Sequence, residues 1–379
     1  MRIRGQHYRT GDLIDLELLQ QQVTAVSAAQ YDIDVDHHHD WLMPGMFDPQ
    51  INGAVGISFN SPELSEAGIM KVVGHCRRHG ITQFFATLVT CAHEVMVRNL
   101  QLIAAIRADI PAVQQVIAGV HLEGPWLSPV DGPRGAHPKE HIRPVNEQEL
   151  RRWLEAAPGL VRLVTLAPEV AGAVEMIPTL TANNIVVAIG HTAATPAQIR
   201  SSVDAGATMS THLGNGCSAM LPRHDNFLWE QLACDHLYGS VIADGFHLPD
   251  AVLQCMIRCK GWERLLLTCD ASSLAGLPPG PYHEWGVDLE ILPTGKIVLQ
   301  GTPYLAGSGV FLDTCVRHLV DRLRCPLGKV LHAVTDHPRQ FFGLAAEGTD
   351  NGFVHGVIGV DCDPTSQLQF DLNYLLAPT

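Results

Sequence analysis

The stretch Val116-Ile117-Ala118-Gly119-Val120-His121-Leu122 is followed directly by Glu123-Gly124-Pro125-Trp126. The first seven residues form a short, mainly apolar run that ends at a Gly-Pro turn signal, which is typical of a strand buried on both faces of a parallel sheet. Glu123 then lies at the carboxyl end of that strand. The same arrangement, a buried strand with a polar residue at its end, recurs along the chain and decides the fold.

Eight apolar runs of this kind lie along the chain, with helical segments between them. They span residues 46–49, 81–89, 116–122, 161–166, 185–189, 208–211, 240–243 and 265–268. Eight is the number of parallel strands that closes a barrel. We therefore predict an α/β fold built on a (β/α)8 TIM-type barrel. Alternation alone would also fit a doubly wound open sheet, and the placement of the polar residues favours the barrel.

Helix-start and helix-stop signals support this alternation. Ser61-Pro62 predicts the start of a helix that ends at Gly80, and Thr195-Pro196 predicts the start of a helix that ends at Gly206. Residues 146–154 and 308–324 are further amphipathic stretches. Before residue 45 the pattern differs, because short alternating segments such as 13–19 and 31–35 indicate a few β-strands ahead of the main domain.

The composition excludes several classes of protein. The 379 residues include 25 Lys and Arg against 39 Asp and Glu, which gives a net charge of −14 and argues against a nucleic-acid partner. Hydrophobic residues make up 46%, enough for a large core. The sequence has no apolar run of about 18 residues, so we expect no membrane partner.

The cysteines and the start of the chain favour a cytoplasmic location. Ten cysteines without a C-x-x-C pair indicate reduced thiols rather than a disulfide framework. The first five residues lack the apolar segment of a secretory signal. The tract Asp36-His37-His38-His39-Asp40 has residues that bind metals, but we expect it to be a solvated surface segment.

Polar residues at the strand ends suggest a catalytic site, since a (β/α)8 barrel builds its site from those ends. The ends carry acidic residues, histidines and polar residues, namely Asp48, Gln50, Thr90, Glu123, Glu169, His191, His212, Asp244, His247 and Asp270. Any one of them could simply start a loop. One carboxylate and two imidazoles from this set would form a three-ligand site with an open position for water, as in catalytic zinc sites. A further carboxylate, for which Asp270 is the candidate, could then exchange the proton of that water.

The sequence also resembles a known family through seven segments in order. These are Met43-Pro44-Gly45-Met46-Phe47-Asp48, His121-Leu122-Glu123-Gly124-Pro125-Trp126, Gly190-His191-Thr192, Thr211-His212-Leu213-Gly214-Asn215, Ile242-Ala243-Asp244-Gly245-Phe246-His247, Cys269-Asp270-Ala271 and Leu305-Ala306-Gly307-Ser308. Together they resemble the N-acetylglucosamine-6-phosphate deacetylase family of the amidohydrolase superfamily.

The resemblance implies a domain organisation. A small β-sandwich domain would be formed by both chain ends, residues 1–45 and 335–379, and the metal-dependent (β/α)8 catalytic barrel would span residues 46–334. Short apolar segments at 352–354 and 367–370 are compatible with strands in the C-terminal part.

The resemblance also implies the chemistry, which is hydrolysis of an N-acetyl amino sugar to acetate and the free amine. Glu123, His191 and His212 would hold the metal, and Asp270 would be the general base and then the general acid. Residues that would contact the substrate are Gln50, Ala136, His137, Asn215, Gly216, Arg223, Asp244, His247, Leu305, Ala306 and Gly307. A homodimer is expected.

Two positions predict a single metal ion in each site. Some relatives in the superfamily bind two ions through a pair of histidines on the first strand and a modified lysine on the fourth. Here the matching residues are Asp48-Pro49-Gln50 and Ala167-Pro168-Glu169, which offer no such ligands. We expect one divalent ion, with zinc first and iron or manganese as alternatives.

The loop after His212 departs from the family pattern. The family has Asn-Ala-Met-Pro there and, further on, an arginine that reaches the sugar phosphate, often across a dimer interface. This chain has Asn215-Gly216-Cys217-Ser218-Ala219-Met220-Leu221-Pro222, and Arg223 with His224 are the phosphate candidates. Two other functions stay open, a related amidohydrolase that acts on another N-acyl or cyclic amide substrate and a non-catalytic metal-binding barrel.

Overall fold

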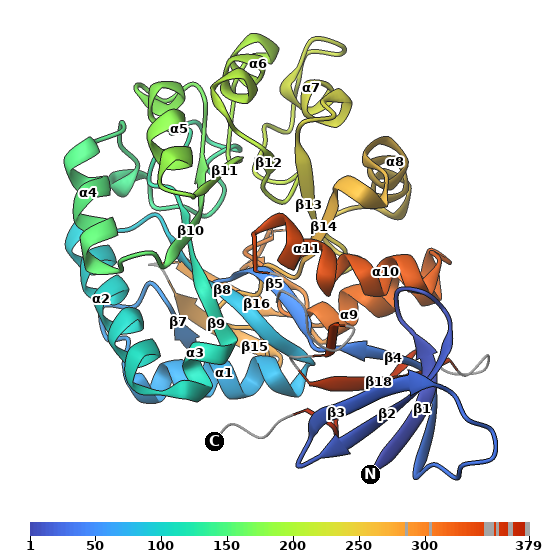
Figure 1. Cartoon of the computed structure of the whole chain (residues 1–379). Helices are drawn as coiled ribbons and strands as arrows, with labels where there is room; N and C mark the ends of the chain where they lie inside the picture. Colours follow the sequence, from blue (N-terminus) through green and yellow to red (C-terminus); the bar gives the residue numbers. More distant parts are fainter. Residues whose placement is uncertain (285–286, 303–304, 345–351, 354–355, 363–366, 376–379) are drawn as a thin grey trace.

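The structure is a computed structural model that describes residues 1–284, 287–302, 305–344, 352–353, 356–362 and 367–375. Its central feature is an eight-stranded sheet in which neighbouring strands are parallel (Figure 1). The strands, in sheet order, are β5 (Met46–Ile51), β8 (Ile81–Val89), β9 (Ile117–Glu123), β10 (Val161–Leu166), β11 (Val186–Ile189), β12 (Met209–Ser210), β13 (Tyr238–Ile242) and β14 (Leu265–Thr268). All eight predicted strands are present, with ends that differ by a few residues.

The first and last strands meet and close the barrel. Ile51 forms a parallel bridge with Ala271, and the N–H of Asn52 donates to the Ala271 carbonyl over 2.9 Å. Buried Asp48 accepts hydrogen bonds from the Thr268 hydroxyl at 2.6 Å and from the backbone N–H of Cys269 at 2.9 Å. Asp48 therefore connects the two edges of the sheet.

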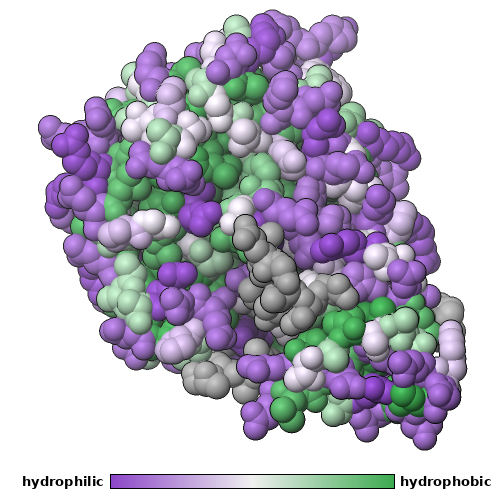
Figure 2. Space-filling model, viewed as in Figure 1, coloured by the Kyte–Doolittle hydropathy of each residue, from purple (hydrophilic) through white to green (hydrophobic). Residues whose placement is uncertain are grey.

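Helices surround this barrel in Figure 1. They are α1 (Glu66–Arg78), α2 (His93–Asp109), α3 (Pro111–Val116), α4 (Glu147–Ala156), α5 (Ala173–Ala182), α6 (Pro196–Ala205), α7 (Phe227–Ala233), α8 (Asp250–Lys260), α9 (Leu312–Arg317), α10 (Leu327–Ala333) and α11 (Asp336–Phe341). Short 3-10 turns occupy Lys139–His141 and Trp262–Arg264, and a π-helical turn spans His318–Arg322. On the face in Figure 2, hydrophilic residues cover the barrel's periphery, as expected for helices with an inward apolar side.

The predicted caps are correct for α6 but displaced for α1. Thr195 and Gln198 form a capping box at the start of α6, and Gly206 ends it with φ +117. In α1 the N-cap is Ser65, not Ser61. The Ser61 hydroxyl instead accepts from the N–H of Glu63 in a separate turn, which delays the helix start.

The two ends of the chain form a six-stranded sheet at the side of the barrel (Figure 1). Its order is β19 (Gln369–Asp371), β18 (Val357–Asp361), β4 (His37–Pro44), β1 (Arg2–His7), β2 (Leu13–Leu19) and β3 (Gln22–Ala28). Residues 31–35 and Gly352-Phe353 are not strands, contrary to the prediction, and Val354 lies outside the described residues. The C-terminal strand begins at Val357 because it pairs antiparallel with β4, Val357 opposite Pro44.

The histidine tract is part of β4, and the prediction of a fully solvated segment was wrong for His39. Its side chain is 6% exposed, because Nδ1 lies 3.0 Å from Oδ2 of Asp361 on β18 and Nε2 lies 2.9 Å from the Tyr374 hydroxyl. His37 and His38 are exposed as predicted. His39 therefore links the two chain ends within the sheet.

Two small sheets were not predicted. The strands β15 (Gly280–Glu284), β16 (Val287–Ile291) and β17 (Ile297–Leu299) follow β14 and pack on Leu274 and Ala306, and β6 (Gly53–Ala54) pairs with β7 (Ile57–Ser58) after β5. Both sheets therefore follow the barrel strands that carry Asp270 and Gln50.

One end of the barrel is filled and the other carries polar groups. An apolar cluster that fills the barrel includes Phe47, Phe85 and, from just after α11, Phe342. The buried Arg339 of α11 donates to the carbonyls of Gly45 and Thr335 beside it. The site is therefore at the opposite end, where the strands terminate. The division into residues 1–45 with 335–379 and residues 46–334 stays a prediction.

Among the residues that the structure describes, none of the helices combines the length and apolar character needed to cross a membrane.

Candidate functional site

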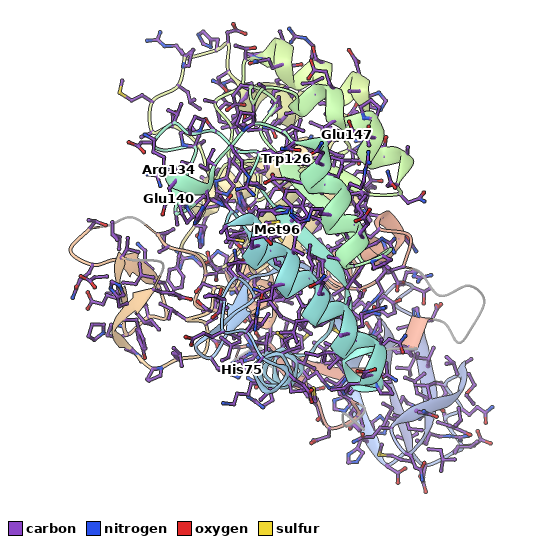
Figure 3. The ribbon with its side chains drawn as sticks, turned by 90° about the vertical axis from the view of Figure 1, so that its left-hand side faces the viewer. His75, Met96, Trp126, Arg134, Glu140 and Glu147 are labelled. Carbon is purple, nitrogen blue, oxygen red and sulfur yellow. The ribbon has the colours of Figure 1, made fainter. Side chains whose placement is uncertain are left out.

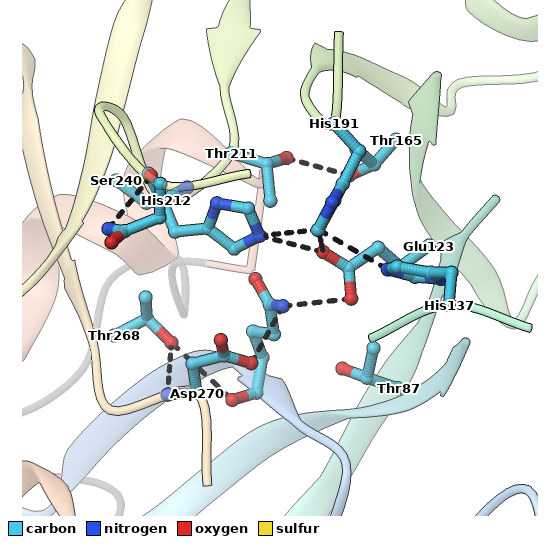
Figure 4. A network of polar contacts seen from close by, with 12 residues as sticks. Thr87, Glu123, His137, Thr165, His191, Thr211, His212, Ser240, Thr268 and Asp270 are labelled. Carbon is cyan, nitrogen blue, oxygen red and sulfur yellow. Dashed lines mark hydrogen bonds and ion pairs between the residues drawn. The ribbon is translucent and has the colours of Figure 1, made fainter. Parts of the chain in front are cut away.

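Three side chains from three strand ends meet at one point. Nε2 of His212 lies 2.9 Å from Oε1 of Glu123, Nε2 of His191 lies 3.2 Å from the same oxygen, and the two nitrogens are 3.0 Å apart (Figure 4). All three residues are at most 8% exposed. Within the described part of the chain, this is the one group of three or more potential ligands whose atoms converge.

The backbone turns sharply where the site residues leave their strands. His191, His212 and Asp270 have φ values of 48°, 28° and 53°, in the left-handed region that non-glycine residues rarely adopt. Each such residue costs on the order of 1–3 kcal/mol. Strand packing therefore holds three site residues in strained conformations that direct their side chains to the barrel mouth.

The hydrogen positions on His191 follow from its partner. Nδ1 of His191 lies 2.8 Å from the carbonyl oxygen of Pro133, which can only accept a hydrogen bond. Nδ1 therefore carries a hydrogen, and Nε2 is the ring atom that faces Glu123 and His212. An imidazole with its hydrogen on Nδ1 binds a metal through Nε2.

Glu123 is held as an anion. Burial opposes its charge, but the hydrogen bonds from His191 and His212 outweigh it and keep the pKa of Glu123 well below its usual range. For His212, burial favours the neutral form, and the contact with Glu123 outweighs it and raises the pKa. Nδ1 of His212 is buried without a hydrogen-bond partner among the described residues. A cation beside Nε2 would balance the charge of Glu123 in place of a proton on His212.

The donor set fits one divalent ion. Metal–ligand bonds of about 2.0–2.2 Å in a tetrahedron place donor atoms about 3.3–3.6 Å apart, slightly more than the separations of 2.9, 3.0 and 3.2 Å given above. Gln50 offers only a neutral amide, and Glu169 accepts instead from the Thr192 hydroxyl at 2.6 Å and the N–H of Ala193 at 2.6 Å. Neither residue supplies an anionic ligand for a second ion at this point.

Asp270 lies beside the cluster and is linked to it by amides. Nε2 of Gln50 donates to Oδ1 of Asp270 at 2.8 Å and to Oε2 of Glu123 at 3.1 Å, and Nδ2 of Asn52 donates to Oδ1 of Asp270 at 2.7 Å. Burial, with the charge of nearby Glu123, raises the pKa of Asp270 to about 6. A carboxyl group with such a pKa can exchange a proton near neutral pH.

His137 comes from the long segment between β9 and α4, on which Figure 3 labels Arg134 and Glu140. Its Nε2 lies 3.2 Å from Nε2 of His191, and its Nδ1 lies 2.9 Å from Oγ1 of Thr90. Burial lowers the pKa of His137 to about 3, so its ring is neutral. The neighbouring Ala136 is exposed.

The side chain of Asp244 is paired with His247. Its Oδ1 accepts from the backbone N–H groups of Phe246 and His247, and its Oδ2 lies 2.7 Å from Nδ1 of His247 and 3.4 Å from the Ser308 hydroxyl. Burial opposes the charge of Asp244, but His247 outweighs it and lowers the pKa. Asp244 therefore orients His247, whose Nε2 is left for another partner.

Residues 305–307 pass close to Asp270. Ser308 donates its N–H to the Asp270 carbonyl at 3.2 Å and bridges to Ala271, and Gly307 is so close to Ser272 that a Cβ on it would lie 2.9 Å from the Ser272 Cβ. This segment therefore forms one wall beside Asp270.

The loop after β12 places two of its predicted residues near the cluster and one further out. Nδ2 of Asn215 donates to the His212 carbonyl at 3.2 Å, and a Cβ on Gly216 would lie 2.7 Å from Nδ1 of His191. Arg223 and His224 are exposed, and no contact places them at the cluster in the described chain.

Sequence reasoning missed two sets of residues. One is Asn52, which contacts Asp270. It lies one residue beyond the end of β5, so it was not among the strand-end candidates. The other set begins at His121, whose Nε2 lies 2.7 Å from the Thr165 hydroxyl. That hydroxyl lies 2.7 Å from the Thr211 hydroxyl (Figure 4). The position of His121 two residues before Glu123, on the same face of β9, was the available signal.

Comparisons with known proteins agree with this geometry. Residues 41–259, more than half of the chain, match the model of the amidohydrolase family. The N-acetylglucosamine-6-phosphate deacetylase of Bos taurus is 37% identical over 314 residues, which cover 80% of this chain and 75% of that protein. The N-acetylgalactosamine-6-phosphate deacetylase of Shewanella sp. (strain ANA-3) is 31% identical over 336 residues, covering 86% and 82%.

A solved structure gives the same result at the level of the fold. The structure of a mutant of the N-acetyl-D-glucosamine-6-phosphate deacetylase from Mycobacterium smegmatis, in complex with N-acetyl-D-glucosamine-6-phosphate, is 29% identical, with a TM-score of 0.85. The match covers 95% of this chain and 95% of that chain. The chain therefore belongs to the amidohydrolase family and, within it, to the N-acetylglucosamine-6-phosphate deacetylase family.

Proposed function

We propose that the protein hydrolyses the N-acetyl amide of N-acetylglucosamine 6-phosphate to glucosamine 6-phosphate and acetate. The observation that carries the proposal is the convergence of Glu123, His191 and His212 at one point, with Asp270 linked to Glu123 through Gln50. Metal ligands and a separate acid/base of suitable pKa are two components that metal-dependent amide hydrolysis uses.

Amidohydrolases depend on metals, and we propose one divalent ion per chain, zinc first, held by Glu123, His191 and His212. When bound, the ion supplies an acidified water molecule and polarises the acetyl carbonyl. Asp270 would accept a proton from the water that attacks the carbonyl carbon, as general base. As general acid it would deliver the proton to the amine nitrogen when the C–N bond breaks, which leaves acetate and the free amine. The amides of Gln50 and Asn52 hold Asp270 in place during both transfers.

The substrate is bound by the remaining residues. His137 and Ala136 contact the acetyl group, with Gln50 nearby. His247, oriented by Asp244, reaches the hydroxyls of the sugar or its phosphate. The sugar pocket and the loop that follows His212 provide further contacts, from Leu305, Ala306, Gly307, Asn215 and Gly216.

Arg223 binds the phosphate from the neighbouring subunit of a homodimer. In the single chain this residue is exposed, and the same region exposes 89% of Met220 and 54% of Trp229. Contiguous patches of exposed apolar side chains mark protein interfaces, and a second copy of the chain would cover these two. The proposed partners are therefore a small-molecule amino sugar and a second copy of the chain, with no nucleic acid and no membrane.

A cytoplasmic location is proposed from the thiols. All ten cysteines are unpaired, which is the state that a reducing compartment maintains.

Acetate release by the metal-loaded protein tests the function. We expect acetate release from N-acetylglucosamine 6-phosphate. From unphosphorylated N-acetylglucosamine we expect a rate at least about tenfold lower, since each loss of about 1.4 kcal/mol of phosphate binding corresponds to a factor of ten. N-acetylgalactosamine 6-phosphate is the second substrate to compare, because a relative named for it is 31% identical. Equal rates with and without phosphate would favour a related amidohydrolase with another N-acyl or cyclic amide substrate. No release of acetate from any of them, with metal bound, would favour a non-catalytic barrel.

A further inference from the structure

Glu169 is a strand-end carboxylate to which the proposed chemistry gives no part. It is half-buried in the turn after β10, and its two oxygens accept from two consecutive residues of the neighbouring strand end. Oε2 accepts from the Thr192 hydroxyl at 2.6 Å, and Oε1 accepts from the N–H of Ala193 at 2.6 Å. Thr192 directly follows His191, so Glu169 contacts the chain immediately beyond a proposed metal ligand.

The backbone of His191 has to be held in place by its surroundings. Its φ of 48° lies in the left-handed region, where a histidine stays only if the contacts around it impose that conformation. On the preceding side, the N–H of Gly190 donates to the Leu166 carbonyl at 3.1 Å, and a Cβ on Gly190 would lie 2.8 Å from Cγ2 of Thr165. The carbonyl of His191 accepts from the N–H of Ser128 at 3.1 Å. These contacts fix the chain up to His191.

Beyond His191 no strand or helix fixes the chain, because residues 190–195 lie between the end of β11 and the start of α6. The Glu169 carboxylate anchors this part with one bond from a side chain and one from the backbone. The Thr192 hydroxyl that donates to Glu169 also accepts from the N–H of Ala194 at 2.9 Å. The anchor therefore reaches three residues beyond His191.

The turn that carries Glu169 is fixed as well. The N–H of Ala167 donates to the Trp126 carbonyl at 2.9 Å, and the N–H of Val170 donates to the Ala167 carbonyl at 3.0 Å. The carboxylate is therefore attached to an anchored part of the barrel mouth.

We propose that Glu169 is a positioning residue for His191, and that it holds Thr192 and Ala193 so that the imidazole stays at the metal site. Its hydrogen bonds keep Nε2 of His191 3.2 Å from Oε1 of Glu123 and 3.0 Å from Nε2 of His212. A ligand that is already in place loses less conformational freedom when the ion binds, so the ion is held more tightly. The inference rests on the proposed function in taking these three residues as the metal ligands.

Two other roles for Glu169 make different predictions. If its charge attracts the ion from a distance, Glu169→Gln and Glu169→Ala should weaken zinc binding equally, because both remove the charge. If it only stabilises the fold, Glu169→Ala should lower the melting temperature and leave the zinc affinity unchanged. If it positions His191, glutamine should substitute for it, because the amide oxygen still accepts a hydrogen bond from Ala193.

The first test measures the zinc dissociation constant by competition with a chelator, without substrate. We expect this constant to be about 10- to 100-fold higher in Glu169→Ala and within about threefold of the parent in Glu169→Gln. Glu230→Ala is the matched control, because Glu230 also accepts a short hydrogen bond, from Arg200 at 2.7 Å, but between α7 and α6. Its zinc affinity should not change. A Glu169→Ala constant within about twofold of the parent, or equal losses in the glutamine and alanine variants, would overturn the proposal.

A second pair of variants tests the same anchor from its other side. Thr192→Val keeps the shape and removes the hydroxyl, whereas Thr192→Ser keeps the hydroxyl and removes a methyl group. We expect the zinc dissociation constant to rise about tenfold in Thr192→Val and to stay within about twofold of the parent in Thr192→Ser. Valine as the better replacement would mean that Thr192 only fills space. That result would overturn the proposal even if Glu169→Ala failed to fold.

Melting temperature and activity separate positioning from the other roles. The metal-free Glu169→Ala protein should melt no lower than metal-free Glu230→Ala, and its kcat should return to within about threefold of the parent once zinc saturates the site. A large fall in melting temperature with the zinc affinity of the parent would make Glu169 structural and overturn the proposal. A kcat that stays low at saturating zinc would place Glu169 in the reaction itself, with the same consequence.

The affinity measurements also separate this inference from the proposed function. A parent protein that releases no acetate, while the variants show the expected zinc affinities, would refute the function and leave the role of Glu169 standing. Acetate release by the parent, with unchanged zinc affinity in Glu169→Ala, would refute the role of Glu169 and leave the function standing.

Discussion

Asn52 donates a hydrogen bond from Nδ2 to Oδ1 of Asp270 over 2.7 Å, although 218 positions separate the two residues in the sequence. Gln50 donates to the same oxygen over 2.8 Å. Both amides thus bind Oδ1, which leaves Oδ2 of Asp270 for proton exchange. Closure of the barrel, which brings β5 next to β14, creates this arrangement.

Asp270→Asn should bind metal and lose turnover. The asparagine oxygen can still accept from Gln50 and Asn52, so the site geometry should survive. Because an amide cannot exchange the proton, we expect kcat to fall by about 10²–10⁴-fold with KM changed little. Acetate release together with metal analysis checks this. A variant that retained more than about a tenth of the parent kcat would mean that another group is the acid/base.

The same substitution should stabilise the metal-free protein in a pH-dependent way. Asp270 has a folded-state pKa of about 6, above the value of about 3.9 expected when unfolded. The folded state therefore disfavours the ionised form of Asp270. Because of this, the free energy of unfolding should fall as the pH rises from about 4 to about 6, by up to about 3 kcal/mol. Asn cannot ionise, so the excess stability of the variant should grow over that range and then level off.

Thermal unfolding in a chelator, from pH 4 to 7.5, measures this difference. Comparing variant with parent at each pH removes the contributions of titrating groups that do not interact with Asp270. A difference in melting temperature that stays constant over the range would contradict a raised pKa for Asp270.

Removal of the metal should abolish activity reversibly. A chelator should yield inactive protein, and about one equivalent of zinc per chain should restore it. In Glu123→Gln the two imidazoles lose their anionic partner, so we expect the bound metal to fall to less than about a tenth of an equivalent after dialysis. Two equivalents in the parent would show that Gln50 or Glu169 takes part in a second site.

Asp244→Asn should affect substrate binding through His247. The carboxylate fixes the hydrogen on Nδ1 of His247, and an amide can present its NH2 group there instead, which favours the other tautomer. We expect kcat/KM to fall about 10- to 100-fold with metal content unchanged. Asp313→Asn is a matched control, since this buried carboxylate contacts His79 away from the site. Equal losses in both variants would indicate a general effect on folding.

Arg223→Ala should reduce the preference for phosphorylated substrate. If Arg223 binds the phosphate, the variant should lose about tenfold or more in kcat/KM for N-acetylglucosamine 6-phosphate and little for the unphosphorylated sugar. Arg200→Ala, an exposed arginine on α6 that pairs with Glu230, is the control. An unchanged ratio between the two substrates would assign the phosphate to other residues.

The sequence was sufficient for the fold and for the residues that converge at the site. Buried parallel strands show as continuous apolar runs, so all eight barrel strands could be located. Because the carboxyl ends of such strands share one end of a barrel, Glu123, His191, His212 and Asp270 could be placed together before any coordinates.

What the sequence could not predict depends on contacts between distant segments. The bond from Asn52 to Asp270 exists only after the barrel closes, and the left-handed backbone at His191 has no local signal such as glycine. The start of β18 is fixed by its pairing with β4, so the alternation around residue 352 was misleading. Hydrogen positions, such as that on Nδ1 of His191, follow from partners contributed by other loops.

The position of β4 between β1 and β18 has a consequence for synthesis of the protein. Leu42 and Pro44 pair with Gly359 and Val357, so about 310 residues must be translated before β4 gains its second neighbour. At bacterial or eukaryotic elongation rates, that takes roughly 15 to 60 seconds. During this interval the nascent chain carries an open strand edge, which is a template for pairing with another chain until β18 covers it.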